Sequence, residues 1–320
     1  MQIVPLTIII PARNSESTLE LVLKSVEKQD YPIKKVVILD NKSTDNTAKI
    51  AKDFAKKSKL SVQVIVHKRD MGLSYSYNEA ISKVRTKLVI TLQSDSTIEK
   101  KNGVRRLVRE FEKNSNVVSA CSLHITPMKI WNQYNFWQKC LFSRLAGKVL
   151  SGRNGRFCCF NTSALKRVGM FKTKYYRSAG EDGDMFYRLM QIGEVVDVNT
   201  LTIHLHSMND KFKLKDYIYK ENQLAEAVGA TMAHNMKRTS VRSWHTALIR
   251  PILIMGLFIP KINYIFALLI VVYVFYYTKD VFIKARKDIR ILALPFINLF
   301  LLFSFTFYFL RGIITKRQKL

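Results

Sequence analysis

Three carboxylates stand close together at residues 181–184, in the order Glu-Asp-Gly-Asp. They end a stretch, from residue 113 to residue 180, that contains no Asp or Glu but twelve Lys or Arg residues. A carboxylate in a pocket within this surround could act as a general base, because burial and nearby cations set its proton affinity. The alternative is a solvated helix N-terminus, where acidic side chains interact favourably with the helix dipole. The pattern leaves both interpretations open, and a phosphorylated substrate would suit the first.

The composition indicates a folded protein with an anionic partner. The chain has 320 residues, of which 48% are hydrophobic, enough to fill one large domain or two moderate ones. Its formal net charge is +28, so nucleic acid, an anionic membrane or a phosphate-bearing substrate could bind it. The basic and aromatic residues do not follow the pattern of a single-strand platform or a groove-reading helix. We therefore expect no nucleic-acid partner.

The four cysteines favour a reduced, cytosolic setting. Cys158 and Cys159 are adjacent, and the sequence has no CxxC pair and no Cys/His metal spacing. The N-terminus runs into an apolar strand without a basic leader, so we expect no secretory signal there.

Strand and helix patterns alternate over the first hundred residues. This alternation predicts an α/β doubly wound sheet, in which ligands bind at the carboxyl ends of the strands. Side chains at 11–14, 40–43, 67–72 and 93–96 occupy those ends. The predicted strands are 6–10, 35–39, 62–66 and 88–92, and the predicted helices are 17–29, 46–57 and 76–84.

Apolar runs near the C-terminus predict transmembrane helices. Residues 291–310 carry no charge and are long enough to cross a bilayer core of about 30 Å. Residues 262–278 form a second span, whereas 251–260 is too short to cross alone and leaves the count at two or three. The loop 279–290 carries five basic residues and should face the cytoplasm.

Several motifs together resemble family 2 glycosyltransferases of the GT-A fold. They are Thr-Ile-Ile-Ile-Pro-Ala-Arg-Asn-Ser-Glu at 7–16, Val-Val-Ile-Leu-Asp-Asn-Lys-Ser-Thr-Asp-Asn-Thr at 36–47, Asp70-Met-Gly-Leu through Asn78, and Glu-Asp-Gly-Asp at 181–184. The resemblance covers residues 6–207. It implies an inverting enzyme that takes a sugar from a nucleotide-diphosphate sugar, with a UDP-sugar favoured.

The resemblance also implies a domain plan. A Rossmann-like GT-A domain would occupy 1–210, with a nucleotide-sugar half at 1–97 and an acceptor half at 98–210. A basic interfacial linker would follow at 211–250, and a membrane region at 251–320.

Site residues are carried over from the resemblance by matching motifs. Asp182 would be the catalytic base, and its neighbour Glu181 would orient it or hold an acceptor hydroxyl. Asp40 would hydrogen-bond the nucleobase. The nucleotide-sugar site would comprise Pro11, Ala12, Arg13, Asn14, Asp40, Gly72, Gln93 and Asp95.

The metal site departs from the family pattern. The family has an Asp-x-Asp triad after the fourth strand, but this chain has Gln93-Ser94-Asp95. Mg²⁺ or Mn²⁺ accepts one or two carboxylates together with diphosphate oxygens and waters, so Asp95 alone is tolerable. His204 and His206 alternate on one face of a predicted strand at 202–206, and His206 is the expected second ligand, with a structural histidine as the alternative.

Basic residues near the base suggest how an acceptor is held. Arg153 and Arg156 flank Gly155 in a loop that could grip an acceptor phosphate or could simply be solvated. Asp184 and Arg188 stand at i and i+4 of a predicted helix, where a salt bridge is the expected interaction.

An aromatic stripe at 131–149 suggests a membrane-bound acceptor. Its apolar residues fall on one face of a predicted helix that suits an anionic membrane interface, with a core helix as the alternative. We therefore expect a hydroxyl of a lipid-linked oligosaccharide or polysaccharide as acceptor, at the cytoplasmic face of the plasma membrane. Transfer to a polyprenyl or dolichyl monophosphate and a catalytically silent scaffold are the alternatives. The sequence does not identify the sugar. The stripe consists of Trp131, Tyr134, Trp137, Leu141 and Leu145.

Overall fold

The protein divides into two compact units that interleave along the chain. The computed structural model describes residues 3–206, 211–236, 241–285 and 287–320. The first unit comprises Met1–Ile130, Leu145–Thr173 and Glu181–Asn209, and the second comprises Trp131–Arg144, Lys174–Gly180 and Asp210–Leu320. The predicted domain boundary after residue 210 falls at residues outside the described ranges.

Four parallel strands begin the first unit, as the alternating pattern predicted. Their order in the sheet is β3-β2-β1-β4, and helices connect them in turn. The predicted strands and helices are all present, with ends that differ by a few residues. The elements are β1 (Leu6–Ala12), α1 (Leu19–Glu27), β2 (Lys35–Asp40), α2 (Thr47–Lys57), β3 (Val62–Val66), α3 (Leu73–Lys83) and β4 (Leu88–Leu92).

The second half of the first unit extends the same sheet. In the described residues the sheet has nine strands, in the order β3-β2-β1-β4-β8-β6-β9-β5, with β7 paired to β6. The strand β8 is antiparallel to both of its neighbours, whereas β6 and β9 are parallel. The elements are β5 (Ser96–Ile98), α4 (Gly103–Lys113), β6 (Val117–Ile125), β7 (Leu150–Ser151), β8 (Phe157–Asn161), α7 (Thr162–Arg167), α8 (Glu181–Leu189) and β9 (Glu194–His204).

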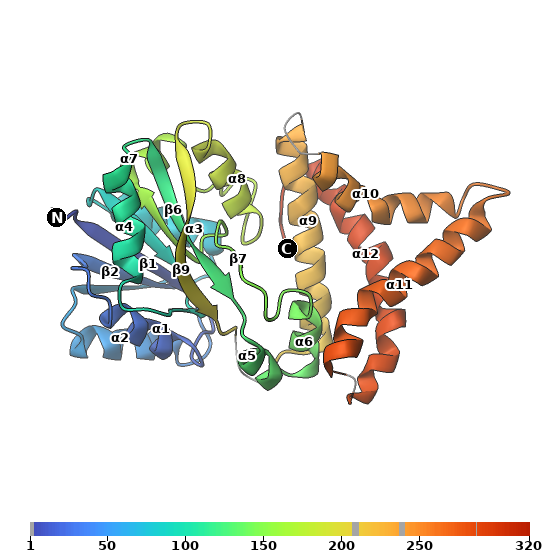
Figure 1. Ribbon diagram of the computed structural model, residues 1–320, viewed down its shortest axis with the longest axis horizontal. Helices are drawn as coiled ribbons and strands as arrows, with labels where there is room; N and C mark the ends of the chain where they lie inside the picture. The colour runs from blue at the N-terminus through green and yellow to red at the C-terminus, as the bar shows by residue number, and fades with distance from the viewer. Residues whose placement is uncertain (1–2, 207–210, 237–240, 286) are drawn as a thin grey trace. The chain divides into compact units, whose positions relative to one another are not determined.

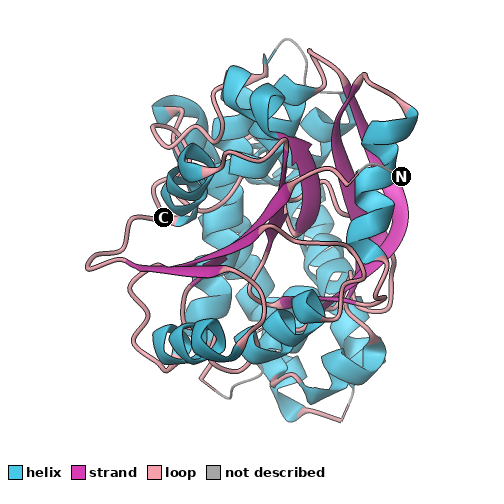
Figure 2. Ribbon diagram, turned by 90° about the vertical axis from the view of Figure 1, so that its left-hand side faces the viewer, coloured by secondary structure: helices cyan, strands magenta, loops and turns pink. Residues whose placement is uncertain are grey.

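Both faces of the sheet are covered by helices (Figures 1 and 2). Successive residues of β1 point to opposite faces. Ile8 and Ile10 pack with buried residues of α1, α2 and α4, whereas Ile9 packs with α3, α7 and α8. A strand buried on both faces reads as a continuous apolar run, which explains the sequence of β1. Because helices cover both faces, a ligand would bind at the carboxyl ends of the parallel strands.

Two predicted elements differ from the structure. The strand predicted at 202–206 is the end of β9, which stops at His204 and leaves His206 in a left-handed conformation with φ 54°. The single helix predicted over 131–149 is wrong. It is replaced by α5 (Met128–Gln133) and α6 (Phe136–Phe142). Asn135 accepts a hydrogen bond from the backbone N–H of Gln138, and the Gln138 side chain accepts one in return, so a capping box starts a new helix there.

The second unit is helical. Within it, Phe136 of α6 packs with Tyr217, Val281 and Leu294, so part of the aromatic stripe is in a helical core. The predicted linker at 211–250 contains a long helix, α9. The elements are α9 (Leu214–His234), α10 (Val241–Gly256), α11 (Asn263–Ala285), the 3-10 helix η2 (Ile289–Ala293) and α12 (Leu294–Thr315).

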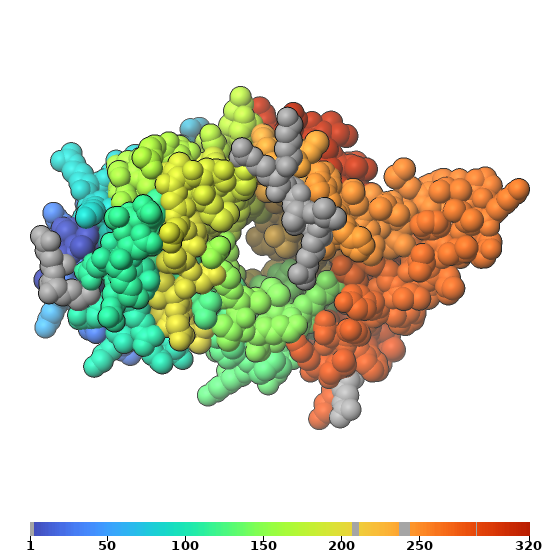
Figure 3. All heavy atoms as spheres, turned by 45° about the horizontal axis from the view of Figure 1, so that its top comes forward, coloured from blue at the N-terminus to red at the C-terminus, as the bar shows by residue number. Residues whose placement is uncertain are grey.

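Two segments of the second unit have the length and composition of membrane spans. Among the described residues, Asn263–Ala285 and Ile289–Thr315 are long and apolar enough to cross a bilayer. The third apolar piece belongs to α10, a helix of 16 residues with Pro251 inside it. In Figure 3 the α10–α11 hairpin, drawn in orange, extends as an arm from the rest of this unit.

Helices α9 and α12 approach each other closely because glycines lie at their contact. A Cβ atom on Gly229 would stand 2.1 Å from the carbonyl oxygen of Phe309, and one on Gly312 would stand 2.2 Å from that of Glu226. Glu226 is fully buried and pairs with Arg311 at 3.1 Å. A larger residue at either glycine would separate the two helices.

The segment after α12, residues 316–320, is held against residues 174–178. The Gln318 backbone N–H donates to the Tyr175 carbonyl at 2.7 Å, and its side-chain oxygen accepts from the N–H groups of Arg177 and Ser178 at 2.9 Å each. Glu226 accepts from the N–H of Lys319 at 2.8 Å. The segment that precedes Glu181 in the chain is therefore fixed within the second unit.

Candidate active site

The ends of β1 and β2 are tied together by polar contacts. Asn14 has a left-handed conformation, with φ 49°, and its side-chain oxygen accepts from the backbone N–H of Thr44 at 2.9 Å. Its own N–H donates to the Ser43 hydroxyl at 2.9 Å. Pro11 and Ala12 are buried at the end of β1. These predicted nucleotide-binding residues thus form one fixed edge of the sheet.

Asp40 has a buried carboxylate oxygen that is available to a ligand. The side chain is 1% exposed, and its Oδ2 accepts from the N–H of Ser43 at 3.2 Å. Its Oδ1 has no hydrogen-bond partner among the described residues. Leaving a buried acceptor unpaired is costly, so a donor group of a ligand would stabilise it. This is the geometry expected of a residue that accepts a hydrogen bond from a nucleobase.

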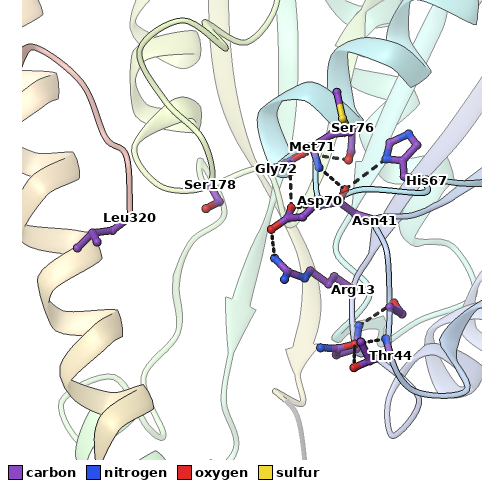
Figure 4. A network of polar contacts seen from close by, with 12 residues as sticks. Arg13, Asn41, Thr44, His67, Asp70, Met71, Gly72, Ser76, Ser178 and Leu320 are labelled. Atoms are coloured by element: carbon purple, nitrogen blue, oxygen red, sulfur yellow. Dashed lines mark hydrogen bonds and ion pairs between the residues drawn. The ribbon is translucent and has the colours of Figure 1, made fainter.

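A network around Asp70 links the loop after β3 to β1 and β2 (Figure 4). Asp70 accepts from the Asn41 side chain at 2.8 Å and from the N–H of Gly72 at 3.0 Å, and it pairs with Arg13. Asn41 also accepts from the N–H of Met71 at 2.9 Å. The network places Arg13 and Gly72, both predicted site residues, in one cluster. Sequence reasoning gave no role to Asn41, although it follows Asp40 at the end of a strand.

Asp95 stands at the end of β4 with His204 beside it. Its Oδ2 lies 3.3 Å from Nε2 of His204, whose Nδ1 lies 3.0 Å from the Thr126 hydroxyl. Burial raises the pKa of Asp95, but His204 and Arg156 outweigh burial and bring it well below its usual range. Burial and Arg156 lower the pKa of His204, so at neutral pH it contributes a hydrogen bond rather than a charge. Asp95 is therefore an ionised carboxylate.

The donor set around Asp95 fits a divalent cation that is shared with a substrate. The His206 ring lies edge-on to the His204 ring, with centroids 5.8 Å apart, and His206 is among the charges that act on Asp95. No group of three or more His, Cys, Asp or Glu side chains in the described residues could hold a metal by itself. Mg²⁺ or Mn²⁺ could bind here with diphosphate oxygens and water completing its shell. Sequence reasoning gave His204 no part in the site, although the alternation of His204 and His206 indicated it.

Gln93 is held by the loop that carries Arg156. The Gln93 N–H donates to the Arg156 carbonyl at 2.9 Å, and the Thr91 hydroxyl donates to the Gly155 carbonyl at 2.9 Å. These bonds bring residues from distant parts of the chain to the same edge of the sheet.

Arg156 affects the pKa values of several titratable side chains in the candidate site. Its charge contributes to the low pKa of Asp95 and opposes the burial that raises the pKa of Asp182. It also reinforces the effect of burial on His124, whose pKa is lowered to about 4. Among the described residues, its buried Nε and Nη1 atoms have no hydrogen-bond acceptor. A guanidinium with free donors binds phosphate oxygens well. Arg156 of this loop thus acts on the predicted metal ligand Asp95 and on the predicted base Asp182, whereas the sequence predicted only an acceptor contact for it.

Asp182, the predicted base, lies in the first turn of α8 (Glu181–Leu189). Burial raises its pKa above the usual value for Asp, against the opposing effects of the Gly183 backbone N–H and Arg156. Glu181 is 5% exposed. Both carboxylates act on buried Tyr77, whose pKa is raised well above normal, first by burial and then by these charges. The Tyr77 hydroxyl has no partner among the described residues, so it is a further polar group near the base that sequence reasoning missed.

The side chains of Arg153 and Arg188 are both paired with carboxylates of the protein. Arg153 is on the surface, where its Nε lies 3.2 Å from Asp197. Arg188 donates to the Asp184 carboxylate at 2.9 and 2.7 Å, so the predicted salt bridge is confirmed. It also donates to the Met170 carbonyl at 2.7 Å, which fixes the turn before α8.

The fold and the site define a nucleotide-sugar transferase of the GT-A class. Residues 7–170, more than half of the chain, match the model described as Glycosyl transferase family 2. The protein belongs to this family and is a glycosyltransferase.

Solved structures agree with this fold. A mannosyltransferase from Pyrobaculum calidifontis, in complex with GDP-Man and Mn²⁺, is 14% identical with a TM-score of 0.58, covering 99% of this chain and 88% of that one. Glucosyl-3-phosphoglycerate synthase from Mycobacterium tuberculosis, with Mn²⁺, UDP and phosphoglyceric acid, is 15% identical with a TM-score of 0.51, covering 71% of this chain and 78% of that one. At these identities the likeness shows the fold.

Among characterised relatives is the 4,4'-diaponeurosporenoate glycosyltransferase of Staphylococcus aureus. It is 29% identical over 126 residues, which are 38% of this chain and 32% of the relative. The chain therefore matches about a third of the length of the relative.

Proposed function

We propose that this glycosyltransferase is an inverting enzyme. It moves a sugar from a nucleoside-diphosphate sugar, with a UDP-sugar favoured, to a hydroxyl of a lipid-linked oligosaccharide or polysaccharide. The observation that carries the proposal is the position of Arg156, which acts on the pKa of both Asp182 and Asp95. Asp182, the proposed base, and Asp95, on the side of the sugar donor, thus have Arg156 as a common cationic neighbour.

The residues of the first unit divide the reaction between them. Asp182 accepts the proton of the acceptor hydroxyl, and its raised pKa makes it a stronger proton acceptor than an ordinary aspartate. Arg156 donates to diphosphate oxygens, whose negative charge grows as the glycosidic bond breaks. A Mg²⁺ or Mn²⁺ ion held by Asp95 and His206 would add charge stabilisation at the same oxygens. Asp40 fixes the base of the nucleotide through its buried Oδ1.

Two comparisons support the donor and the metal. The mannosyltransferase is seen with GDP-Man and Mn²⁺, and the synthase with UDP and Mn²⁺. For the acceptor, the two apolar segments of the second unit support a lipid-linked substrate, because they could hold the enzyme at a membrane. The cysteine pattern, which favours a reduced setting, supports the cytoplasmic face of the plasma membrane for that reaction.

A donor screen tests the proposal. The full chain in detergent is incubated with UDP- and GDP-sugars and a cell lipid extract, and nucleoside diphosphate release and glycolipid formation are measured. We expect one donor to give both products. Asp182→Asn should reduce turnover about 10² to 10⁴-fold and leave donor binding nearly unchanged, because it removes a base but keeps size and hydrogen bonding. Turnover within about threefold of wild type would exclude Asp182 as the base.

A further inference from the structure

Two arginines of the second unit converge on one tyrosine ring. The guanidinium carbon of Arg144 lies 3.5 Å from the ring centre of Tyr277, and that of Arg250 lies 5.1 Å from the same centre. Arg250 also stands 3.7 Å from the ring centre of Phe305 and donates from Nε to the Tyr273 hydroxyl. We call Arg144, Arg250, Tyr273 and Tyr277 the arginine cluster. Stacking on aromatic rings holds both guanidinium planes in place.

The arginine cluster has an excess of positive charge. Neither arginine takes part in any of the ion pairs that arginines form in the described part of the chain. The nearby acid is Glu221 on α9, on which both arginines act. Burial raises the pKa of Glu221 in spite of these cations, so Glu221 neutralises at most one of the two charges. The cluster therefore favours an anion.

An apolar groove lies between α10 and α11 and shares a residue with the cluster. Its volume is about 670 Å³, and its walls include Trp244, Leu248, Ile252, Phe266, Leu269 and Tyr273. Tyr273 lines the groove, while its hydroxyl receives the hydrogen bond from Arg250. The groove thus has apolar walls, and Tyr273 connects it to the arginine cluster. A ligand that fits both parts has a long apolar chain and an anionic head.

We propose that the arginine cluster and this groove bind a lipid phosphate. The phosphate contacts Arg144 and Arg250, and the apolar chain lies along the groove. Guanidinium groups suit this role because their planar donors match phosphate oxygens. Charged residues among apolar helices are costly and are kept for binding or transport roles. The inference rests on the proposed function and narrows its acceptor to lipids that carry a phosphate on the chain.

Binding of farnesyl phosphate to the full chain in detergent tests the site. Farnesol and inorganic phosphate are the two comparison probes, and dissociation constants are measured by calorimetry. Arg144→Gln and Arg250→Gln should each weaken farnesyl phosphate binding about ten- to a hundredfold, as expected for a lost charge-assisted hydrogen bond. Leu269→Trp, which fills the groove, should weaken both farnesyl phosphate and farnesol.

Arg290→Gln is the matched control. Arg290 also stacks on a ring, that of Phe136 at 4.8 Å, but it lies outside the cluster and pairs with Asp288. This variant should bind farnesyl phosphate as the wild type does. Arg144→Lys and Arg250→Lys keep the charge without the planar donors and should bind with intermediate affinity. They also keep the test decisive if a glutamine variant fails to fold.

Three results would overturn the inference. They are equal affinity for farnesol and farnesyl phosphate, competition by inorganic phosphate at the same concentration, and unchanged binding in both arginine variants. The proposed function fails in a different way. If no donor gives a glycolipid while farnesyl phosphate still binds through the arginines, the lipid-phosphate site stands and the transfer reaction is wrong.

Discussion

Arg156 acts on the pKa of four titratable side chains of the first unit. Two of them, Asp95 and Asp182, are acids that the proposed reaction uses in ionised form. A cation near both favours their ionised states. Its Nε and Nη1 have no acceptor among the described residues, so in the proposed reaction they are available to the diphosphate. We therefore expect Arg156 to matter for the pH dependence of the reaction as well as for donor binding.

Replacing Arg156 by Gln should move the acid limb of the pH profile to higher pH. Burial raises the pKa of Asp182, and the charge of Arg156 opposes this effect. Without that charge the carboxyl keeps its proton to a higher pH, so activity is lost earlier as the pH falls. A nearby charge shifts a pKa by about one unit or more.

The measurement is turnover between about pH 4 and pH 9 at saturating donor. Arg109→Gln is the control, because it makes the same change of charge on an exposed face of α4. It should leave the profile in place. An acid limb that stays fixed in the Arg156 variant would show that Asp182 is not the group titrating there.

Asp95→Ala should weaken donor binding and abolish any dependence on Mn²⁺. The reason is that Asp95 is the ionised carboxylate at the end of β4. Gln93→Asp supplies the acid that the family usually has, so it should keep activity or raise it at limiting metal. Activity is measured over a Mn²⁺ titration and in EDTA. Equal rates in EDTA and in Mn²⁺ would rule out the metal role.

The residues at the strand ends could be predicted because their positions follow from the pattern of the parallel strands. Asp40 and Asp95 each come at the end of an apolar run, and such ends meet at one edge. The role of Arg156 could not be predicted in this way. It depends on hydrogen bonds from the Thr91 hydroxyl and the Gln93 N–H to the carbonyls of Gly155 and Arg156, and contacts of that sequence separation leave no periodic signal.

At the scale of elements, the misreading of 131–149 shows a limit of periodicity. Apolar residues continue at helical spacing through Asn135, but this residue closes one helix and caps the next. Asn followed by Gln three residues later was a readable capping box. The predicted end of the strand at residue 206 is wrong for another reason. The strand β9 ends at His204, because the Leu205 N–H donates to the Asp95 carbonyl at 2.8 Å.

Gln318→Ala should destabilise the second unit. Its side-chain oxygen accepts from two backbone N–H groups, at Arg177 and Ser178, and the residue is 2% exposed. Leaving these donors unpaired costs about 1 to 3 kcal/mol. In a unit of this size we expect the thermal midpoint to fall by about 2 to 4 °C per kcal/mol.

The midpoint is followed by scanning calorimetry in detergent. Arg317→Ala is the control, because this neighbour in the same segment is exposed and should change stability by less than about 0.5 kcal/mol. If both variants melt at the wild-type temperature, the contact with residues 174–178 contributes nothing to stability.

At the scale of the whole molecule, the two units are not consecutive in the sequence. The second unit takes in residues 131–144 and 174–180, both of which lie inside the predicted catalytic domain of 1–210. The chain becomes strongly apolar near residue 250, and this change of composition marks the predicted membrane region but not the interleaving. A domain plan drawn from the sequence therefore divides the chain into consecutive parts.

A protein shortened to end at residue 240 should bind nucleotide but lose transfer to lipid-linked acceptors. The predicted nucleotide-binding residues all lie in the first unit. The shortened chain lacks both apolar spans, and basic residues beside anionic lipid add only about 1 kcal/mol each. Rates are compared with a liposomal acceptor and with a short water-soluble analogue. Equal liposomal rates for both proteins would show that the spans only locate the enzyme.

The contact between Gln318 and Arg177 joins positions 141 residues apart. At roughly 5 to 20 residues per second, a ribosome makes Gln318 about 7 to 30 seconds after Arg177. Early in that interval β9, the last strand of the sheet in chain order, is made, and both apolar segments of the second unit follow before Gln318. Until then residues 174–178, which precede Glu181, lack their hydrogen bonds to residues 316–320. The segment 174–178 therefore reaches its final arrangement only after residue 318 has left the ribosome, so a translational pause within α12 would delay the completion of the second unit.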